Sequence, residues 1–93
     1  MYTLVFAPRF TRSFRKLSKS GRFPLQKFEL ALKYFKNGKT LPSAYQDHQL
    51  KGELSIQREF HLGYDLLVQY KRNEEQNIIT LSKIGTHTEL FGA

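Results

Sequence analysis

A chain of 93 residues with 40% hydrophobic side chains, including eight Phe and five Tyr, can build one packed core. The absence of cysteine excludes disulfides, thiolate metal sites and a cysteine nucleophile, and no apolar run approaches the roughly 20 residues of a membrane helix. We therefore expect a single domain over residues 1–93, located in the reducing cytoplasm, without secretion signal or membrane contact.

The net charge of +7 is unevenly distributed. Residues 1–46 hold ten Lys/Arg and one acidic residue, Glu29, whereas residues 47–93 hold five Lys/Arg and seven acidic residues. Such a basic segment favours a polyanionic partner such as nucleic acid, because neutralising phosphates releases counterions. The alternative is a basic surface that only keeps the protein soluble.

The first predicted element is a strand over residues 1–6, where side chains alternate in character. Pro8 ends this strand and suits the first turn of a helix over about residues 8–19. The apolar residues of that helix recur at helical spacing: Phe10, Phe14 and Leu17. Its other face either binds phosphates or is simply solvated, and carries Arg9, Arg12, Arg15, Lys16 and Lys19.

A second helix is predicted from Pro24 to the helix-stopping pair Asn37-Gly38. Its apolar residues also recur at helical spacing: Leu25, Phe28, Ala31, Leu32 and Phe35. Residues 40–50 are expected to form a connection, and three strands follow over about residues 53–61, 64–71 and 77–84, with a polar turn at 73–77. The pattern indicates an α+β fold: an N-terminal strand, a two-helix hairpin covering one face of the sheet, then an antiparallel β-meander.

All three histidines, His48, His61 and His87, lie in the second half of the chain. Imidazole is suited to proton transfer near neutral pH because its ordinary pKa is about 6.5. Asp65 follows His61 by four residues, and a turn at Gly63 would bring the two side chains together. Incidental histidines on the surface are the alternative.

A zinc site made of the three histidines and Asp65 is a second alternative, since zinc accepts imidazole and carboxylate ligands. No pair among them has the short spacing common in zinc sites. We therefore expect no metal and no other cofactor.

Two cations accompany the histidines: Arg58 precedes His61 by three residues, and Lys83 precedes His87 by four. RNA can be cleaved without metal when one group accepts the 2′-OH proton, another protonates the leaving oxygen, and cations stabilise the phosphate. The alternatives are an ion pair of Arg58 with Glu53 or Glu59, and a solvent-facing strand end for Lys83.

Three aromatic residues are candidates for stacking on an unpaired base, a contact worth about 1–3 kcal/mol. They are Tyr64, Tyr70 and Phe91. Core packing is the alternative for Tyr70, whereas Phe91 is hard to explain as core because chain ends usually fray.

Four segments carry a shared pattern: Asp47-His48-x-Leu50-x-Gly52, Arg58-Glu59-Phe60-His61-x-x-x-Asp65, Leu66-Leu67-Val68-Gln69-Tyr70, and Gly85-Thr86-His87-x-x-Leu90-Phe91-Gly92. In this order and spacing they resemble the YafQ branch of the RelE-like toxins, within the RelE/ParE superfamily. The match is strong over residues 41–93, and the helical hairpin agrees in pattern and basic character.

The resemblance implies a ribosome-dependent endoribonuclease of a type II toxin–antitoxin pair, an mRNA interferase that inhibits translation. It implies a cognate antitoxin, ribosome and messenger RNA as partners, and leaves open contact with operator DNA through the antitoxin complex. The catalytic residues it implies are His48, His61, Asp65, Lys83 and His87, with Arg58 and Phe91 binding substrate. Two positions depart from the best-known toxin of this branch, which has arginine in place of Lys83 and tryptophan in place of Leu66.

The competing interpretation is a non-catalytic protein on the same scaffold, either a gyrase inhibitor like the ParE toxins or a basic nucleic-acid-binding module. Either class works without three histidines. The basic helical half and an apolar groove would in any case suit an acidic, partly disordered antitoxin segment that folds on binding.

Overall fold

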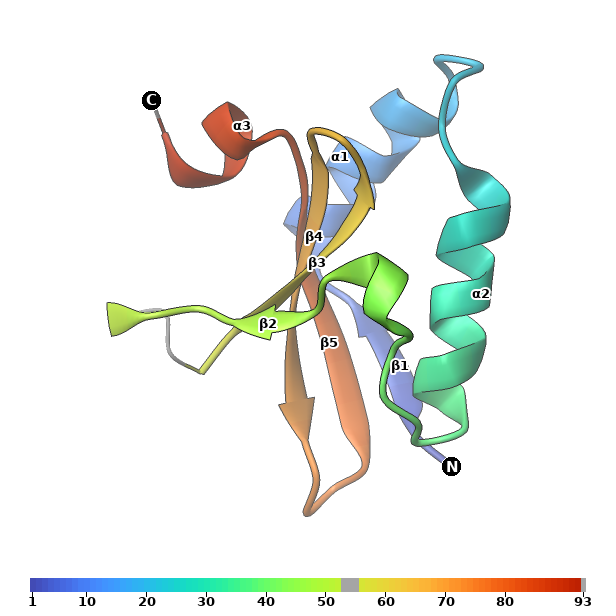
Figure 1. Ribbon diagram of the computed structural model, residues 1–93, viewed down its shortest axis with the longest axis vertical. Helices are drawn as coiled ribbons and strands as arrows, with labels where there is room; N and C mark the ends of the chain where they lie inside the picture. Colours follow the sequence, from blue (N-terminus) through green and yellow to red (C-terminus); the bar gives the residue numbers. More distant parts are fainter. Residues whose placement is uncertain (53–55, 93) are drawn as a thin grey trace.

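The computed structural model describes residues 1–52 and 56–92 of the chain. Its elements in order are β1 (Thr3–Phe6), α1 (Pro8–Ser18), α2 (Leu25–Lys36), the short 3-10 turn η1 (Ser43–Tyr45), β2 (His48–Gln49), β3 (Arg58–Gly63), β4 (Leu66–Asn73), β5 (Ile78–Gly85) and α3 (His87–Phe91) (Figure 1). The predicted α+β class is confirmed. Residues 53–55, placed in the first meander strand from the sequence, lie outside the described residues.

The strands form one sheet in the order β1-β5-β4-β3-β2. β3, β4 and β5 make the predicted antiparallel meander, and β1 pairs in parallel with β5, so that Thr3 lies opposite Ile78 and Phe6 opposite Leu81. The first strand of the chain therefore lies beside the last one, and β1 and β2 are the two edge strands of the sheet.

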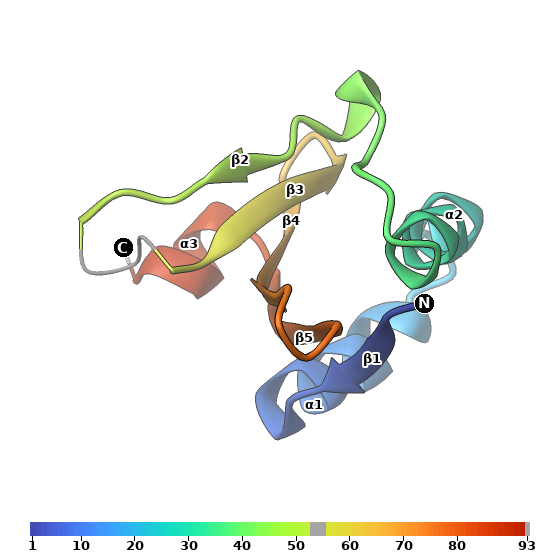
Figure 2. The same ribbon diagram turned by 90° about the horizontal axis from the view of Figure 1, so that it is seen from below.

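Helix α2 covers one side of the sheet, and α3 lies on the opposite side (Figure 2). Phe35 of α2 packs against Phe60 of β3 and Tyr70 of β4, with ring centroids 5.7 and 4.7 Å apart. Phe10 of α1 joins this core through Phe28 of α2, at 6.0 Å. The helical spacing of the phenylalanines thus produced a continuous aromatic core. Among the described residues, every helix falls short of the length and apolar character needed to cross a bilayer.

The face of the sheet turned away from this core carries two rows of residues that lie opposite one another across the strands. The first row runs through His48, Glu59, Gln69 and Lys83, and the second through His61, Leu67 and Gly85. Because side chains alternate between the faces of a strand, the neighbours Phe60, Val68 and Tyr70 point the other way, into the core. We call the face of the sheet that carries the two rows, opposite the core, the polar face.

A β-bulge in β5 brings Lys83 to the polar face. Gln69 lies opposite Lys83, but the next residue, Tyr70, lies opposite Leu81, so Ser82 is the extra residue. Strict alternation from the buried residue Leu81 would turn Lys83 toward the core. One inserted residue moves each side chain after it to the opposite face of the sheet. Bulges commonly redirect side chains in this way beside functional sites.

Three short elements were not predicted from the sequence. The segment expected to be a connection contains η1 and β2, and β2 extends the sheet through pairs of His48 with Glu59 and Gln49 with Arg58. The end of the chain contains α3, which begins with Thr86 as its cap and buries Leu90 to 8% exposure. The burial of Leu90 ties the helix down, and Phe91 beside it is 45% exposed and lies outside the core, as expected from the sequence.

Candidate active site

The first group of functional side chains on the polar face consists of His48, Glu59 and His61. The Nε2 atom of His48 lies 3.3 Å from Oε1 of Glu59, and the two imidazole rings are 5.9 Å apart at their centroids. Pairing of β2 with β3 produces this arrangement, because it sets His48 directly opposite Glu59, two residues before His61.

The contacts of His48 hold its ring from both sides. Its Nδ1 lies 2.8 Å from the carbonyl oxygen of Gln46, and its Nε2 faces Glu59. A carbonyl oxygen only accepts hydrogen bonds, so Nδ1 donates to Gln46. The ring of His48 is therefore oriented between the backbone and the Glu59 carboxylate.

Glu59 is a further functional candidate, which from its sequence position was expected only as an ion-pair partner of Arg58. It is 2% exposed, and its second oxygen, Oε2, accepts a hydrogen bond of 3.2 Å from Nε2 of Gln69. A carboxylate so deeply buried needs partners of this kind. The signal in the sequence was the spacing of two between Glu59 and His61, which places both side chains on one face of a strand.

His61 is the least exposed of the three histidines. Burial lowers the pKa of His61 below its ordinary value, and the charges of His48, His87 and Lys27 act in the same direction against the opposing effect of Glu59. His61 is accordingly held in its neutral form to a lower pH than an ordinary histidine.

The second group consists of Asp65, His87 and Phe91. Oδ1 of Asp65 accepts a hydrogen bond of 3.1 Å from the backbone N–H of His87 and lies 3.3 Å from Nδ1 of the same residue. The backbone hydrogen bond first, and the His87 side chain with it, lower the pKa of Asp65. Nδ1–H thus points at the carboxylate and Nε2 is left for other chemistry. The predicted turn after Gly63 is present, but it carries Asp65 to His87 rather than to His61.

Helix α3 fixes His87 and Phe91 relative to each other. Their rings stack with centroids 5.8 Å apart, and Phe91 remains 45% exposed. A capping box holds the start of the helix: Oγ1 of Thr86 accepts from the N–H of Glu89 at 3.2 Å, and Oε1 of Glu89 accepts from the N–H of Thr86 at 2.8 Å. An exposed aromatic ring beside an oriented imidazole suits a nucleobase and its phosphate.

The two predicted cations are separated by the structure. Lys83 lies on the polar face with the histidines, whereas Arg58 points to the other face, where its Nε lies 3.3 Å from Oδ1 of Asp47. Asp47 also accepts hydrogen bonds of 2.8 and 2.9 Å from the hydroxyl of Tyr70. The partner of Arg58 is therefore Asp47 rather than Glu59, and Glu53 lies outside the described residues.

The aromatic candidates other than Phe91 have different surroundings. Tyr70 is fully buried and belongs to the core, as the alternative interpretation held, and both its burial and its bond to Asp47 raise the pKa of its hydroxyl. Tyr64 is fully exposed on the turn between β3 and β4. It borders a hollow that also touches Asp65 and is lined on the helical side by Leu17 and Phe23.

Comparison with known proteins gives the family. Residues 2–92 match the family described as "Bacterial toxin of type II toxin-antitoxin system, YafQ". The chain belongs to the YafQ toxin family. The resemblance noted in the sequence is thereby confirmed, and with it the RelE superfamily of type II toxins.

Individual relatives agree with this assignment. The mRNA interferase toxin YafQ of Escherichia coli strain K12 is 35% identical over 52 residues, which make up 56% of this chain and 54% of that protein. The chain thus spans about half the length of this curated relative. A crystal structure of a metal-bound toxin from Helicobacter pylori superposes with a TM-score of 0.87 at 33% identity, covering 98% of this chain and 100% of that one. The crystal structure of the Escherichia coli DinJ–YafQ toxin–antitoxin complex gives a TM-score of 0.84 at 23% identity, with 98% of each chain covered.

One group of side chains in this YafQ-family protein has the spacing of a metal site. One nitrogen of His48, one of His61 and one oxygen of Glu59 all lie within 4.8 Å of one another. These atoms could hold a single divalent cation with imidazole and carboxylate ligands. Asp65, weighed as a ligand from the sequence, instead faces His87.

Proposed function

We propose that this YafQ-family chain is a metal-independent endoribonuclease that cleaves messenger RNA on the ribosome and is neutralised by a cognate antitoxin. Family membership and the Escherichia coli mRNA interferase relative support this proposal. The observation that carries it is the convergence of two acid–base groups, His48–Glu59–His61 and Asp65–His87, on one face of the sheet.

His61 is suited to the role of general base. Its lowered pKa keeps the imidazole neutral near pH 7, so that it accepts the proton of the ribose 2′-OH. The 2′-oxygen then attacks phosphorus, and the bond from phosphorus to the 5′-oxygen breaks. The products are a 2′,3′-cyclic phosphate and a free 5′-OH.

His87 is suited to the role of general acid. Asp65 holds its Nδ1, which leaves Nε2–H to donate to the departing 5′-oxygen. The ammonium of Lys83 supplies positive charge for the phosphate, and His48 lies in the same row of the same face. Lysine acts here as a point charge rather than as the planar fork of an arginine.

Variants of His87 test the proposal. In a translation reaction containing purified ribosomes and a defined messenger, the wild-type protein is expected to cut, and His87→Gln to cut about 10²- to 10⁴-fold more slowly, the usual contribution of a general acid. Primer extension measures the cut. Glu75→Gln, on the exposed hairpin between β4 and β5, is the control and keeps the wild-type rate. Full cleavage by His87→Gln would remove this residue from the mechanism.

Three further arms separate the parts of the proposal. Retained cleavage in EDTA supports metal independence, whereas loss of cleavage that added zinc restores would assign the His48–Glu59–His61 group to a metal. Cleavage of naked messenger at the same rate would contradict ribosome dependence. Intact messenger together with inhibited gyrase would favour the non-catalytic ParE-like alternative.

A further inference from the structure

Gln69 is a buried polar residue in the middle of β4, directly beneath the proposed catalytic groups. It is 0% exposed and occupies the first row of the polar face between Glu59 on β3 and Lys83 on β5. Its neighbour two residues earlier on the same face, Leu67, is equally buried. An apolar side chain at position 69 would therefore fit the packing, and a glutamine there needs a specific reason.

The hydrogen bonds of Gln69 supply that reason. Its Nε2 donates to Oε2 of Glu59 at 3.2 Å, and since a carboxylate only accepts, the amide nitrogen must face it. Its Oε1 is buried without a hydrogen-bond partner among the described residues. The chain thus keeps an amide whose carbonyl is unsatisfied, which costs stability. What it gains is a donor aimed at Glu59.

The donor determines which way the Glu59 carboxylate points. With Oε2 held by Gln69, the other oxygen, Oε1, is directed at Nε2 of His48. The chain of contacts Gln69–Glu59–His48 then ends at the carbonyl of Gln46 on the far side of the imidazole ring. The contacts on its two sides therefore fix the orientation of the His48 ring.

We propose that Gln69 is a positioning residue of the nuclease, which orients Glu59 and through it the ring of His48 toward the phosphate. This proposal rests on the proposed function. Gln69 itself does not touch substrate, because its side chain is fully covered. Removing it leaves the residues that bind RNA in place and disturbs only the geometry of the charged groups.

The test is a double-variant cycle of Gln69→Leu and Glu59→Gln, measured as cleavage of messenger on the ribosome. Gln69→Leu is expected to lower kcat about 10- to 100-fold, the range for partners that orient functional ligands, with KM changed less than about twofold. Because Gln69 acts through Glu59, the double variant is expected to be no slower than Glu59→Gln alone. A purely structural role predicts instead that the two losses multiply, and that outcome would overturn the proposal.

Two controls make the result unambiguous. Gln57→Leu is the same substitution two residues before Glu59, at a side chain whose Oε1 is likewise buried and unpaired, and it is expected to retain the wild-type kcat. If Gln69→Leu does not fold, as thermal unfolding will show, Gln69→Met takes its place in the cycle. Wild-type kcat in the folded variant at position 69 would refute the positioning role, whereas an inactive wild-type protein would refute the nuclease function itself.

Discussion

His61 has a different environment from the two exposed histidines, and this difference has consequences for pH dependence. Burial favours its neutral form, so the pKa of His61 lies below the ordinary value of about 6.5. The pH profile of kcat/KM reports the groups of the free enzyme that must carry or lack a proton. If His61 is the base, the acid limb of that profile has its midpoint below about pH 6.5. A midpoint above 7 would exclude His61 from this role.

The same shift predicts how the stability of the fold responds to acid. The unfolded chain takes up a proton at His61 near pH 6.5, and the folded chain only at lower pH, so the free energy of unfolding falls as pH drops through this window. His61→Gln removes this contribution. The free energy of unfolding, measured by urea denaturation, is then expected to depend less on pH between pH 7 and about 5. Asp65 acts in a separate window: its lowered pKa contributes stability that is lost only below about pH 4.

At the scale of elements, α3 depends on its surroundings. A helix of five residues is too short to be stable alone. Here the capping box holds its start, and the side chain of Leu90 is buried against the rest of the protein. A Cβ added at Gly85 would lie 3.0 Å from Oε1 of Glu89, the atom that accepts from the N–H of Thr86. Glycine at this position leaves room for the Glu89 side chain, and its backbone angle is one that other residues also adopt.

Gly85→Ala is therefore predicted to displace Glu89, break the capping box and move His87. We expect a loss of about 0.5–2 kcal/mol in the free energy of unfolding, typical for a lost cap, together with slower messenger cleavage. Gly63→Ala is the matched control, since the nearest atom to its added Cβ is 4.0 Å away. Equal behaviour of the two variants would show that α3 tolerates the change and that the cap does not hold the site.

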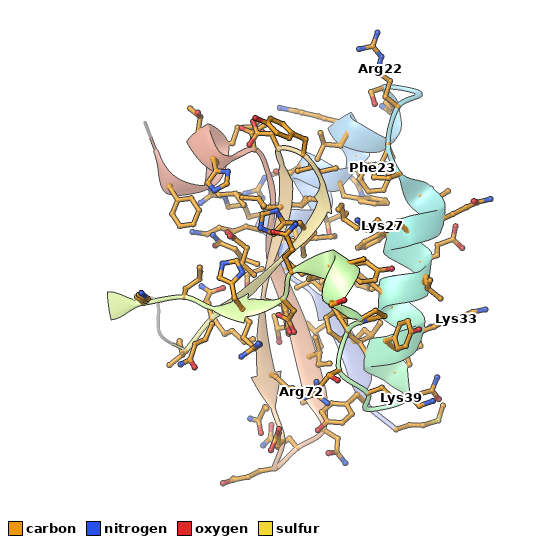
Figure 3. The ribbon with its side chains drawn as sticks, in the orientation of Figure 1. Arg22, Phe23, Lys27, Lys33, Lys39 and Arg72 are labelled. Carbon is orange, nitrogen blue, oxygen red and sulfur yellow. The ribbon has the colours of Figure 1, made fainter. Side chains whose placement is uncertain are left out.

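At the scale of the whole molecule, positive charge extends over the surface well beyond the active site. Arg22 projects from the connection between α1 and α2 at one end, whereas Lys39 lies toward the other end (Figure 3). The exposed face of α1 adds a concave patch lined by Arg9, Arg12, Ser13, Arg15 and Lys16. A surface this extended suits a partner that wraps around the protein better than one that only plugs the site.

We accordingly predict that association with the cognate antitoxin, proposed by analogy with the DinJ–YafQ complex, weakens with salt. The dissociation constant, measured by calorimetry, is expected to rise at least about tenfold between 50 and 500 mM NaCl. Arg12→Glu combined with Arg15→Glu should weaken binding further at low salt, and Glu75→Gln should not. An affinity independent of salt would show that apolar contacts alone hold the complex.

The sequence alone determined the elements whose signal is local. Phenylalanines at helical spacing gave α1 and α2, alternation and a polar turn gave the meander, and the four motif segments gave the family and the candidate residues. Patterns of this kind can be read from sequence because they repeat within a few residues. β2 has only two residues and no such pattern, and α3 has only the capping-box pair Thr86 and Glu89 at its start, so both depend on their contacts.

Only the tertiary structure decided which candidates meet. Asp65 pairs with His87, 22 residues away, and the bulge at Ser82 turns Lys83 toward the histidines. Strand pairing set Glu59 between His48 and Gln69, and the same pairing sent Arg58 to Asp47 on the other face. Register and bulges are long-range properties, fixed by the packing of the whole sheet, and a shift of one residue exchanges its faces. The sequence determines which chemical groups are present, whereas the tertiary structure determines which of them are in contact.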